Sequence, residues 1–299
     1  MNILHQYIDK ILKPTNDLMN FVPSKINKIA NVLKNNSTLS LNEVISGGSY
    51  KKGTMLRYKP DIDIVLVFNK QEGIKRNWVS LMNQVNNNLK TAFPKSKITK
   101  GDNIAIHLEF INNNKPINFD VVASYYVNSP VQMSSVKNSK IYQGITSLWH
   151  LRYFDKWKNI EYFKEVVMLL KDWKNKHKIN LKSFHMELIA ASAYEYRLEN
   201  NYTLETFLIS CFQNIQGMID GTPIFPVNWE YFDKSSLNTH YDFPLLIDPA
   251  NPNENLLKNL SAENAKNIKN KATKAIAHIK KGFFGKVFDP KNQTKIFKD

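Results

Sequence analysis

Hydrophobic residues follow a helical spacing at both ends of the chain and a strand-like spacing between them. In residues 2–36 they recur every three or four positions, and Pro14 and Pro23 predict two breaks in this helical segment. Residues 43–123 instead hold short runs that alternate or stay apolar, as strands do. From about residue 146 the helical spacing returns. We therefore expect an α+β protein whose strands lie in the first half of the chain.

The predicted elements suggest two lobes. Strands are predicted at residues 43–46, 61–68, 104–110 and 116–123. After the first segment, helices are predicted near residues 50–56, 77–93, 160–176, 184–198, 204–215 and 261–281. The turn Asn112-Asn113-Asn114 should join the last two strands as a hairpin. We expect residues 1–145 to form a lobe with a mixed sheet and helices, and residues 146–299 to form a helical lobe.

Two aspartates stand at the start of the second strand, shortly after a glycine-rich turn. Asp61 and Asp63 are two residues apart, so both carboxylates should lie on one face of the strand. Carboxylates this close repel each other unless a cation neutralises them, and Mg²⁺ prefers carboxylate and phosphate oxygens. The preceding Gly47-Gly48-Ser49 turn offers backbone N–H groups and a hydroxyl that suit a phosphate. Together these features indicate metal-assisted nucleotidyl transfer.

A third acid occurs in the last predicted strand. Asp120 is the one acidic residue in an otherwise apolar run, where an acid is costly to bury without a partner or a metal. The hairpin should bring it into the sheet beside Asp61 and Asp63. On the preceding strand, His107 and Glu109 alternate with apolar neighbours, and we expect them to be ordinary residues of a polar face.

The amino-acid composition excludes several classes of protein. The single cysteine, Cys211, excludes a disulfide framework and a thiolate metal site. No apolar run approaches the length of a membrane span, and we expect a cytoplasmic protein with no membrane contact. The formal charge of +15 is compatible with an RNA or DNA activator. It does not demonstrate one, because the lysines are scattered along the whole chain and nucleoside triphosphates also need basic residues.

The glycine turn followed by Asp-x-Asp resembles the signature of the DNA polymerase β-like nucleotidyltransferases. A second set of segments resembles the helical half of 2′-5′-oligoadenylate synthetases and of their bacterial relatives, the cyclic GMP–AMP synthase/DncV-like nucleotidyltransferases (CD-NTases). These segments are Leu169–Trp173, Lys182–Leu188 and Asp248–Asn255. The resemblance spans about residues 45 to 280 and implies the bilobal fold of that superfamily, in its oligoadenylate-synthetase-like branch.

The resemblance also implies roles for individual residues. Asp61, Asp63 and Asp120 would be the catalytic acids and would bind two Mg²⁺ ions, or Mn²⁺ in their place. The nucleotide-binding residues would be Gly48 and Ser49 at the donor triphosphate, Lys171 and Ser183 reaching it from the second lobe, and Phe184 stacked on the base. From the residues alone, Lys171 is equally well a solvated lysine and Phe184 equally well a core residue. Asp248 and Asn255 are expected to fix a loop backbone rather than to touch substrate.

As an activity, the resemblance implies synthesis of a cyclic di- or trinucleotide from ATP and other NTPs by a monomeric enzyme. The product would be a second messenger for a separate effector in bacterial antiphage (CBASS-type) defence. The activator stays open between RNA and a regulatory protein, whereas the chain lacks the Cys/His spacing of a zinc insertion for DNA binding. The alternatives are a linear oligoadenylate synthetase, a CCA-adding or RNA-tailing enzyme, and an inactive RNA-binding module. The last predicts a missing acid, and all three are present.

Overall fold

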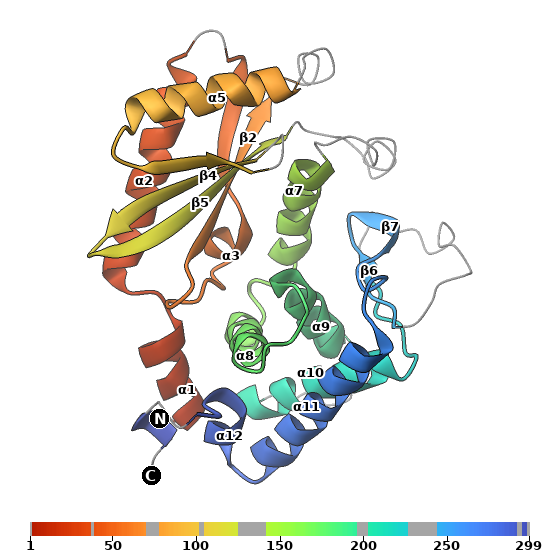
Figure 1. Cartoon of the computed structure of the whole chain (residues 1–299). Coiled ribbons are helices and arrows are strands. Elements are labelled where there is room, and N and C mark those ends of the chain that lie inside the picture. Colours follow the sequence, from red (N-terminus) through yellow and green to blue (C-terminus); the bar gives the residue numbers. More distant parts are fainter. Residues whose placement is uncertain are drawn as a thin grey trace. The chain divides into compact units, whose positions relative to one another are not determined.

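The computed structural model divides the chain into two compact units, and Figure 1 labels most of their elements. The sheet unit is Pro14–Arg152, and the helical unit combines Met1–Lys13 with Tyr153–Asp299. A single boundary at residue 145 was expected, whereas here the first thirteen residues belong to the helical unit and the second boundary follows Arg152. The structure describes residues 2–36, 39–69, 78–101, 105–124, 142–195, 203–226, 244–291 and 295–297.

The sheet unit is built on a mixed five-stranded sheet with the order β1-β2-β5-β4-β3. Its central pair, β2 and β5, is parallel, and the other neighbouring strands are antiparallel. The expected hairpin joins β4 to β5 through Asn113 and Asn114, both at positive φ, as a two-residue primed turn requires. The strands are β1 (Leu41–Ser46), β2 (Asp61–Phe68), β3 (Lys97–Lys100), β4 (Ala105–Asn112) and β5 (Lys115–Ser124).

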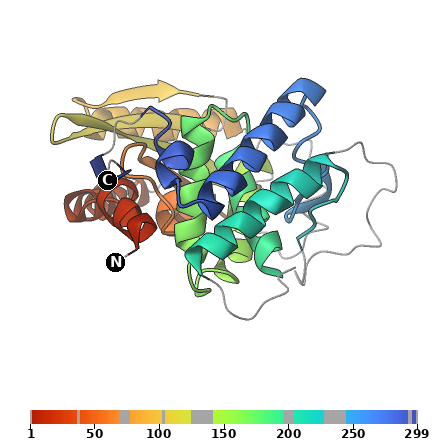
Figure 2. The same cartoon turned by 90° about the horizontal axis from the view of Figure 1, so that it is seen from below.

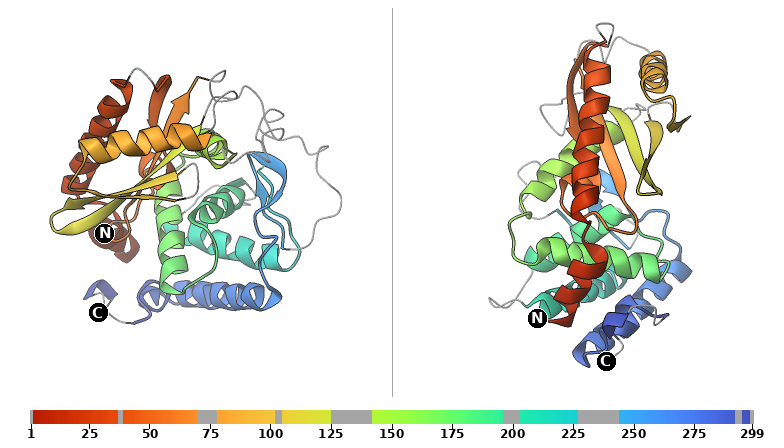
Figure 3. Two further views of the ribbon diagram at one scale, coloured as in Figure 1. Left: turned by 45° about the horizontal axis from the view of Figure 1, so that its top comes forward. Right: turned by 90° about the vertical axis from the view of Figure 1, so that its left-hand side faces the viewer.

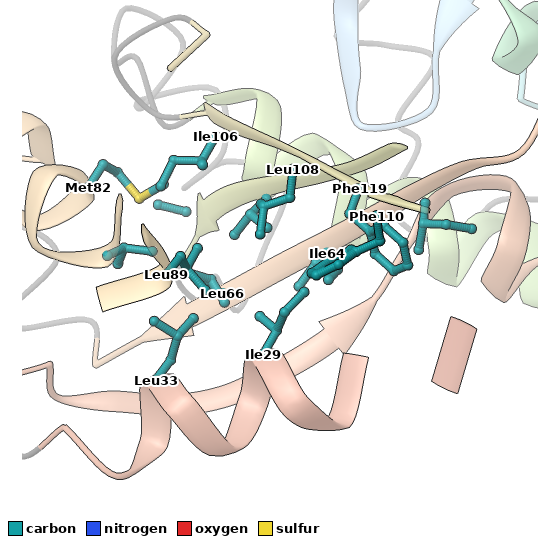
Figure 4. Close-up of a cluster of buried hydrophobic side chains, with 14 of the residues drawn as sticks. Ile29, Leu33, Ile64, Leu66, Met82, Leu89, Ile106, Leu108, Phe110 and Phe119 are labelled. Carbon is teal, nitrogen blue, oxygen red and sulfur yellow. The ribbon is translucent and has the colours of Figure 1, made fainter. Parts of the chain in front are cut away.

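Two helices, α2 (Asn16–Lys34) and α5 (Trp78–Ala92), cover the same face of this sheet. Figure 3 (left) shows α5 crossing the strands. Alternate residues of the strands are apolar and point toward these helices, which the period of two predicts. The resulting buried cluster is drawn in Figure 4, with Ile29 and Leu33 of α2, Met82 and Leu89 of α5, and Ile64, Leu66, Ile106, Leu108 and Phe119 of the sheet.

The break predicted at Pro23 is absent from α2, which runs through it as one helix. Thr15 caps the helix by accepting a hydrogen bond from the backbone N–H of Leu18. The buried residues Val22 and Ile29 stand on either side of the proline. Packing against the sheet therefore holds the helix together despite the hydrogen bond that proline cannot donate. The break at Pro14 is confirmed, since the preceding π-helical turn η1 (Ile8–Leu12) ends before it.

The helical unit contains α8 to α12 together with the N-terminal helix. Figure 2 shows α10 and α11 lying side by side, and α9 packs against both α8 and α10. Thr203 and Ser261 cap α10 and α11, and Gly282 follows α11 at positive φ. The elements are α1 (Ile3–Tyr7), α8 (Phe163–Lys176), α9 (Ser183–Glu195), α10 (Leu204–Ile219), β6 (Ile247–Asp248), β7 (Asn251–Asn255), α11 (Ala262–Lys280), α12 (Phe284–Phe288) and the 3₁₀ turn η3 (Lys295–Phe297). Helix α7 (Tyr142–Asp155) contains the boundary between the units.

A buried hydrogen bond ties the N-terminal helix to the rest of the helical unit. The Tyr7 hydroxyl donates to Oδ2 of Asp172 on α8 at 2.8 Å, and it lies 3.2 Å from the carbonyl oxygen of Phe288 on α12. Both Tyr7 and Asp172 are fully buried. This contact explains why the first thirteen residues belong to the helical unit. Among the helices that the structure describes, none is long and apolar enough to cross a membrane.

We predict that Tyr7→Phe destabilises the helical unit by about 1–3 kcal/mol, because a buried carboxylate loses its hydroxyl donor. Thermal and urea unfolding of the full chain measure the change. The control is Tyr58→Phe, which removes a hydroxyl from a side chain that is 46% exposed, and it should change stability by less than about 0.5 kcal/mol. Equal effects of the two variants would contradict the anchoring role of Tyr7.

Stability should also depend on pH through His177, whose Nε2 donates to the carbonyl of Val287 at 2.8 Å. Burial lowers the pKa of His177, and the nearby charges of Lys271 and His278 lower it further, against the opposing effect of that hydrogen bond. The unfolded chain therefore binds the proton first as the pH falls, so stability decreases below about pH 6.5. We predict that the melting temperature drops between pH 7.5 and 5.5, and that His177→Gln, which retains an N–H donor, reduces this drop. A slope unchanged by the substitution would contradict this prediction.

Candidate active site

The three predicted acids lie on one face of the sheet unit. Asp61 and Asp63 are alternate residues of β2, and the parallel register pairs Asp63 directly with Asp120 of β5. Asp61 is paired in the same way with Asn118. Directly paired residues on neighbouring strands share a face and stand about 5 Å apart. The strand pairing therefore brings Asp120 directly beside Asp63 and onto the same face as Asp61, where we expected it to lie.

The face of the sheet that carries the acids is exposed to solvent at the start of β2 and buried further along this strand. Asp61 is exposed, Asp63 is half-buried, and the Asp120 side chain is 31% exposed. Two residues after Asp63 the same face becomes apolar, and Val65 and Val67 form a buried cluster with Leu148 of α7. The acids thus lie at the uncovered end of a face that α7 otherwise shields, where a substrate can reach them.

The glycine turn packs directly against Asp63. The backbone N–H of Gly47 donates to the carbonyl of Asp63 at 2.7 Å. Gly48 opens the short helix α3 (Gly48–Lys51) with a φ of +53°. A Cβ atom at Gly48 would lie only 1.5 Å from Oδ2 of Asp63. Both the left-handed backbone and the lack of space therefore require glycine here.

The residues that follow Gly48 complete the turn. Ser49 is half-buried in α3, and its carbonyl accepts the backbone N–H of Thr54 at 2.9 Å, which closes the turn. Partial burial raises the pKa of the Tyr50 hydroxyl, so this phenol stays neutral near pH 7. The turn is thus a compact structure that holds Gly48 and Ser49 next to the acids.

His107 has a contact that its alternating sequence position did not predict. It is paired with Asp120 in the antiparallel register of β4 and β5, and its Nδ1 lies 2.5 Å from Oδ1 of that acid. Glu109, which we also expected to be an ordinary polar-face residue, is paired with Asn118 and Lys97 instead. The cross-strand partner that distinguishes His107 from Glu109 depends on the register of the hairpin, which the Asn113-Asn114 turn sets and the alternation within β4 does not.

The residues present fit a divalent cation by chemistry and by strand register. Three carboxylates on one face are the oxygen ligands that Mg²⁺ and Mn²⁺ prefer. Within the described ranges, no three His, Cys, Asp or Glu side chains are already assembled as a metal site. The carboxylate of Asp63 faces Gly48 and that of Asp120 faces His107. Like charges without a cation repel, so rotation of the Asp63 side chain would accompany metal binding.

The remaining predicted nucleotide-binding residues belong to the helical unit. Lys171 lies on α8 and is only 4% exposed, so the alternative of a solvated lysine is wrong. Ser183 is exposed as the first residue of α9, and Phe184 beside it is half-buried. Helices α8 and α9 pack against each other, which places these three residues on one pair of helices.

Asp248 and Asn255 fix a loop backbone, as expected. Oδ1 of Asp248 accepts the backbone N–H of Ala250 at 2.8 Å. Oδ1 of Asn255 accepts the N–H groups of Leu246 and Leu257 at 3.2 and 3.0 Å. These contacts hold the short β6–β7 pair in place and leave both side chains committed to the backbone.

Comparisons with known proteins identify a matching domain family and a shared fold. Residues 26–143 match the model of the nucleotidyltransferase domain family. A comparison of the sequence with curated proteins finds no match. Among solved structures, the chain is similar to CdnC of E. coli MS115-1, in a complex with HORMA-deltaN and in a structure with ATP. Both structures have 21% identity, cover 96% of each chain and give a TM-score of 0.71.

Two terminal uridylyl transferases are also similar in structure. Cid1, described as having RNA terminal uridylyl transferase activity, has 14% identity, a TM-score of 0.65 and coverage of 91% of each chain. Terminal uridylyl transferase 4 of Trypanosoma brucei with bound UTP has 12% identity and a TM-score of 0.63, over 93% of this chain and 96% of that one. At these identities the likeness shows the fold alone. Residues 26–143 thus match a nucleotidyltransferase domain, in a chain whose α+β fold is similar to that of CdnC.

Proposed function

We propose that the chain transfers nucleotidyl groups from NTPs, with Asp61, Asp63 and Asp120 as its catalytic, metal-binding acids. The observation that carries this proposal is the direct pairing of Asp63 with Asp120 beside the Gly48 turn. The three acids would hold Mg²⁺, or Mn²⁺ in its place. When bound, two such ions neutralise charge on the attacking and leaving oxygens of the displacement.

The reaction is an in-line displacement at the α-phosphorus of the NTP. The oxygen of an acceptor hydroxyl forms a bond to phosphorus, the bond to the β-phosphate oxygen breaks, and pyrophosphate leaves. Gly48 and Ser49 bind the triphosphate through backbone N–H groups and the serine hydroxyl. Asp120 assists removal of the proton from the acceptor hydroxyl.

The helical unit supplies the other nucleotide contacts in this proposal. Ser183 is exposed and Phe184 is half-exposed at the start of α9, so a hydroxyl and an aromatic ring are accessible to a nucleotide. Ser183 contacts the triphosphate and Phe184 stacks on the base, whereas the buried Lys171 would first have to become exposed to reach the triphosphate.

The product we propose is a cyclic di- or trinucleotide that acts as a second messenger on a separate effector, in CBASS-type antiphage defence. The fold is shared with CdnC over 96% of both chains, and CdnC has been solved with ATP and with HORMA-deltaN. This likeness supports ATP as one substrate and favours a regulatory protein over RNA as the partner that controls activity.

A second candidate is the addition of nucleotides to an RNA end. The likeness to Cid1 covers 91% of each chain at a TM-score of 0.65, only slightly below that of CdnC. A linear oligoadenylate synthetase would use the same three acids. An inactive RNA-binding module is disfavoured, because all three acids are present on one accessible face.

We predict that Asp61→Asn combined with Asp63→Asn abolishes turnover, and that Asp120→Asn lowers it at least about 100-fold. The melting temperature without metal should stay the same or rise, because carboxylate repulsion is relieved. The control is Glu109→Gln, a change on the same face away from Asp120, which should retain activity. Pyrophosphate release with Mg²⁺ measures turnover, and substantial turnover in the double variant would overturn the assignment of the acids.

The products distinguish the candidate reactions. The chain is incubated with four labelled NTPs and Mg²⁺ or Mn²⁺, with and without RNA, and the products are treated with phosphatase and weighed by mass spectrometry. We expect a small phosphatase-resistant product, since a cyclic nucleotide has no terminal phosphate. Extended RNA would favour the terminal-transferase alternative, and a phosphatase-sensitive oligomer would favour a linear synthetase.

Gly48 gives an independent test of the turn. We predict that Gly48→Ala lowers both the melting temperature and turnover, because the new Cβ overlaps the carboxylate of Asp63. The control is Gly282→Ala, which has a similar positive φ of +73° but nothing within 4 Å of the new Cβ. It should lose only about 1–2 kcal/mol of stability from backbone strain and keep its activity. Equal turnover in the two variants would contradict the close packing of the turn on Asp63.

A further inference from the structure

We propose that His107 is a positioning residue that orients the Asp120 carboxylate for the divalent cation, and that Gly101 exists to make room for its ring. This inference rests on the proposed function of Asp120. It concerns a side chain outside the motifs that identify the acids. Two observations carry it. One is the contact between His107 and Asp120, and the other is the lack of space for a side chain at Gly101, directly after β3.

The contact between His107 and Asp120 has a defined direction. Nδ1 of His107 and Oδ1 of Asp120 are 2.5 Å apart on directly paired residues of β4 and β5. An ionised carboxylate can only accept, so Nδ1 of His107 is the donor in this hydrogen bond. The hydrogen bond engages Oδ1 and leaves Oδ2 as the oxygen that we assign to the cation. A carboxylate held at one oxygen loses less rotational freedom when it binds a metal.

The position of the ring is built into the edge of the sheet. Gly101 directly follows β3, and its backbone N–H donates to the carbonyl of Ala105 at 3.2 Å. A Cβ atom at Gly101 would lie 2.3 Å from Nε2 of His107. Its φ lies outside the left-handed region, so conformational freedom does not explain this glycine. Instead, the imidazole of His107 occupies the space that a side chain at residue 101 would need.

The exposure of His107 argues against a role in packing. Its side chain is 48% exposed, and the apolar core lies on the opposite face of the sheet. Its removal should therefore affect stability little. Nitrogen ligands are also not what Mg²⁺ prefers, so a role through Asp120 fits better than direct coordination.

The test compares four variants of the full chain by Mn²⁺ binding, read from the electron paramagnetic resonance signal of the free ion. His107→Leu removes the donor and should weaken Mn²⁺ binding about 10- to 100-fold. His107→Asn keeps an N–H donor at the position of Nδ1 and should stay within about threefold of the native chain. Gly101→Ala should weaken binding as His107→Leu does, although His107 itself is unchanged. His278→Leu, on α11 of the helical unit, is the matched control and should bind normally.

Turnover supplies a second measurement. In His107→Leu the Mn²⁺ concentration for half-maximal turnover should rise by the same factor as the dissociation constant, while the KM for ATP at saturating Mn²⁺ stays unchanged. Normal Mn²⁺ affinity in both His107→Leu and Gly101→Ala, or an equal loss in His107→Asn, would overturn the proposal.

Asp120→Asn separates the two levels of inference. If it retains full Mn²⁺ affinity, the proposed role of Asp120 itself is wrong. If it loses affinity while His107→Leu does not, the acid is a ligand and only the positioning role of His107 is wrong.

Discussion

The parallel pairing of β2 with β5 is the constraint on which the candidate site depends. It sets Asp63 opposite Asp120 and leaves Asp61 on the same face, although Asp120 is 57 residues further along the chain than Asp63. A shift of one residue would turn Asp120 into the core and bring Val121 out beside Asp63. The buried cluster formed with α2 and α5 opposes that shift, because it needs Val121 and Phe119 on the inner face. Core packing on one side of the sheet thus fixes the chemistry on the other.

Much of this arrangement follows from local sequence patterns. The features that these patterns do not predict depend on contacts between different segments of the chain. The Asp-x-Asp spacing, the alternating strands and the Asn113-Asn114 turn predict the acid-bearing pair, because each depends on residues close in sequence. The continuity of α2 through Pro23 does not follow from such patterns, because packing at Val22 and Ile29 outweighs the local tendency of proline to end a helix. The short strand β3 was not predicted either. The contact of His107 with Asp120 depends on the register of the β4–β5 hairpin, which the length of the Asn113-Asn114 turn sets and the alternation within β4 alone does not.

The fold alone does not determine which product the chain makes. CdnC and the terminal uridylyl transferases share this fold with the chain over most of their length, although two of the three are described as enzymes that add nucleotides to RNA or bind UTP. Function therefore has to be argued from the residues of the site. In our proposal the acids carry out the transfer reaction, and the choice of base and acceptor would depend on the helical unit, where Ser183 is exposed and Phe184 is half-buried.

The most direct test of the central claim is anomalous diffraction from crystals of the chain grown with Mn²⁺ and a non-hydrolysable ATP analogue. The account predicts manganese peaks with carboxylate oxygens of Asp61, Asp63 and Asp120 at about 2.0–2.2 Å, and the triphosphate beside Gly48 and Ser49. Manganese bound elsewhere in the presence of the analogue, or a metal site that excludes Asp120, would contradict it.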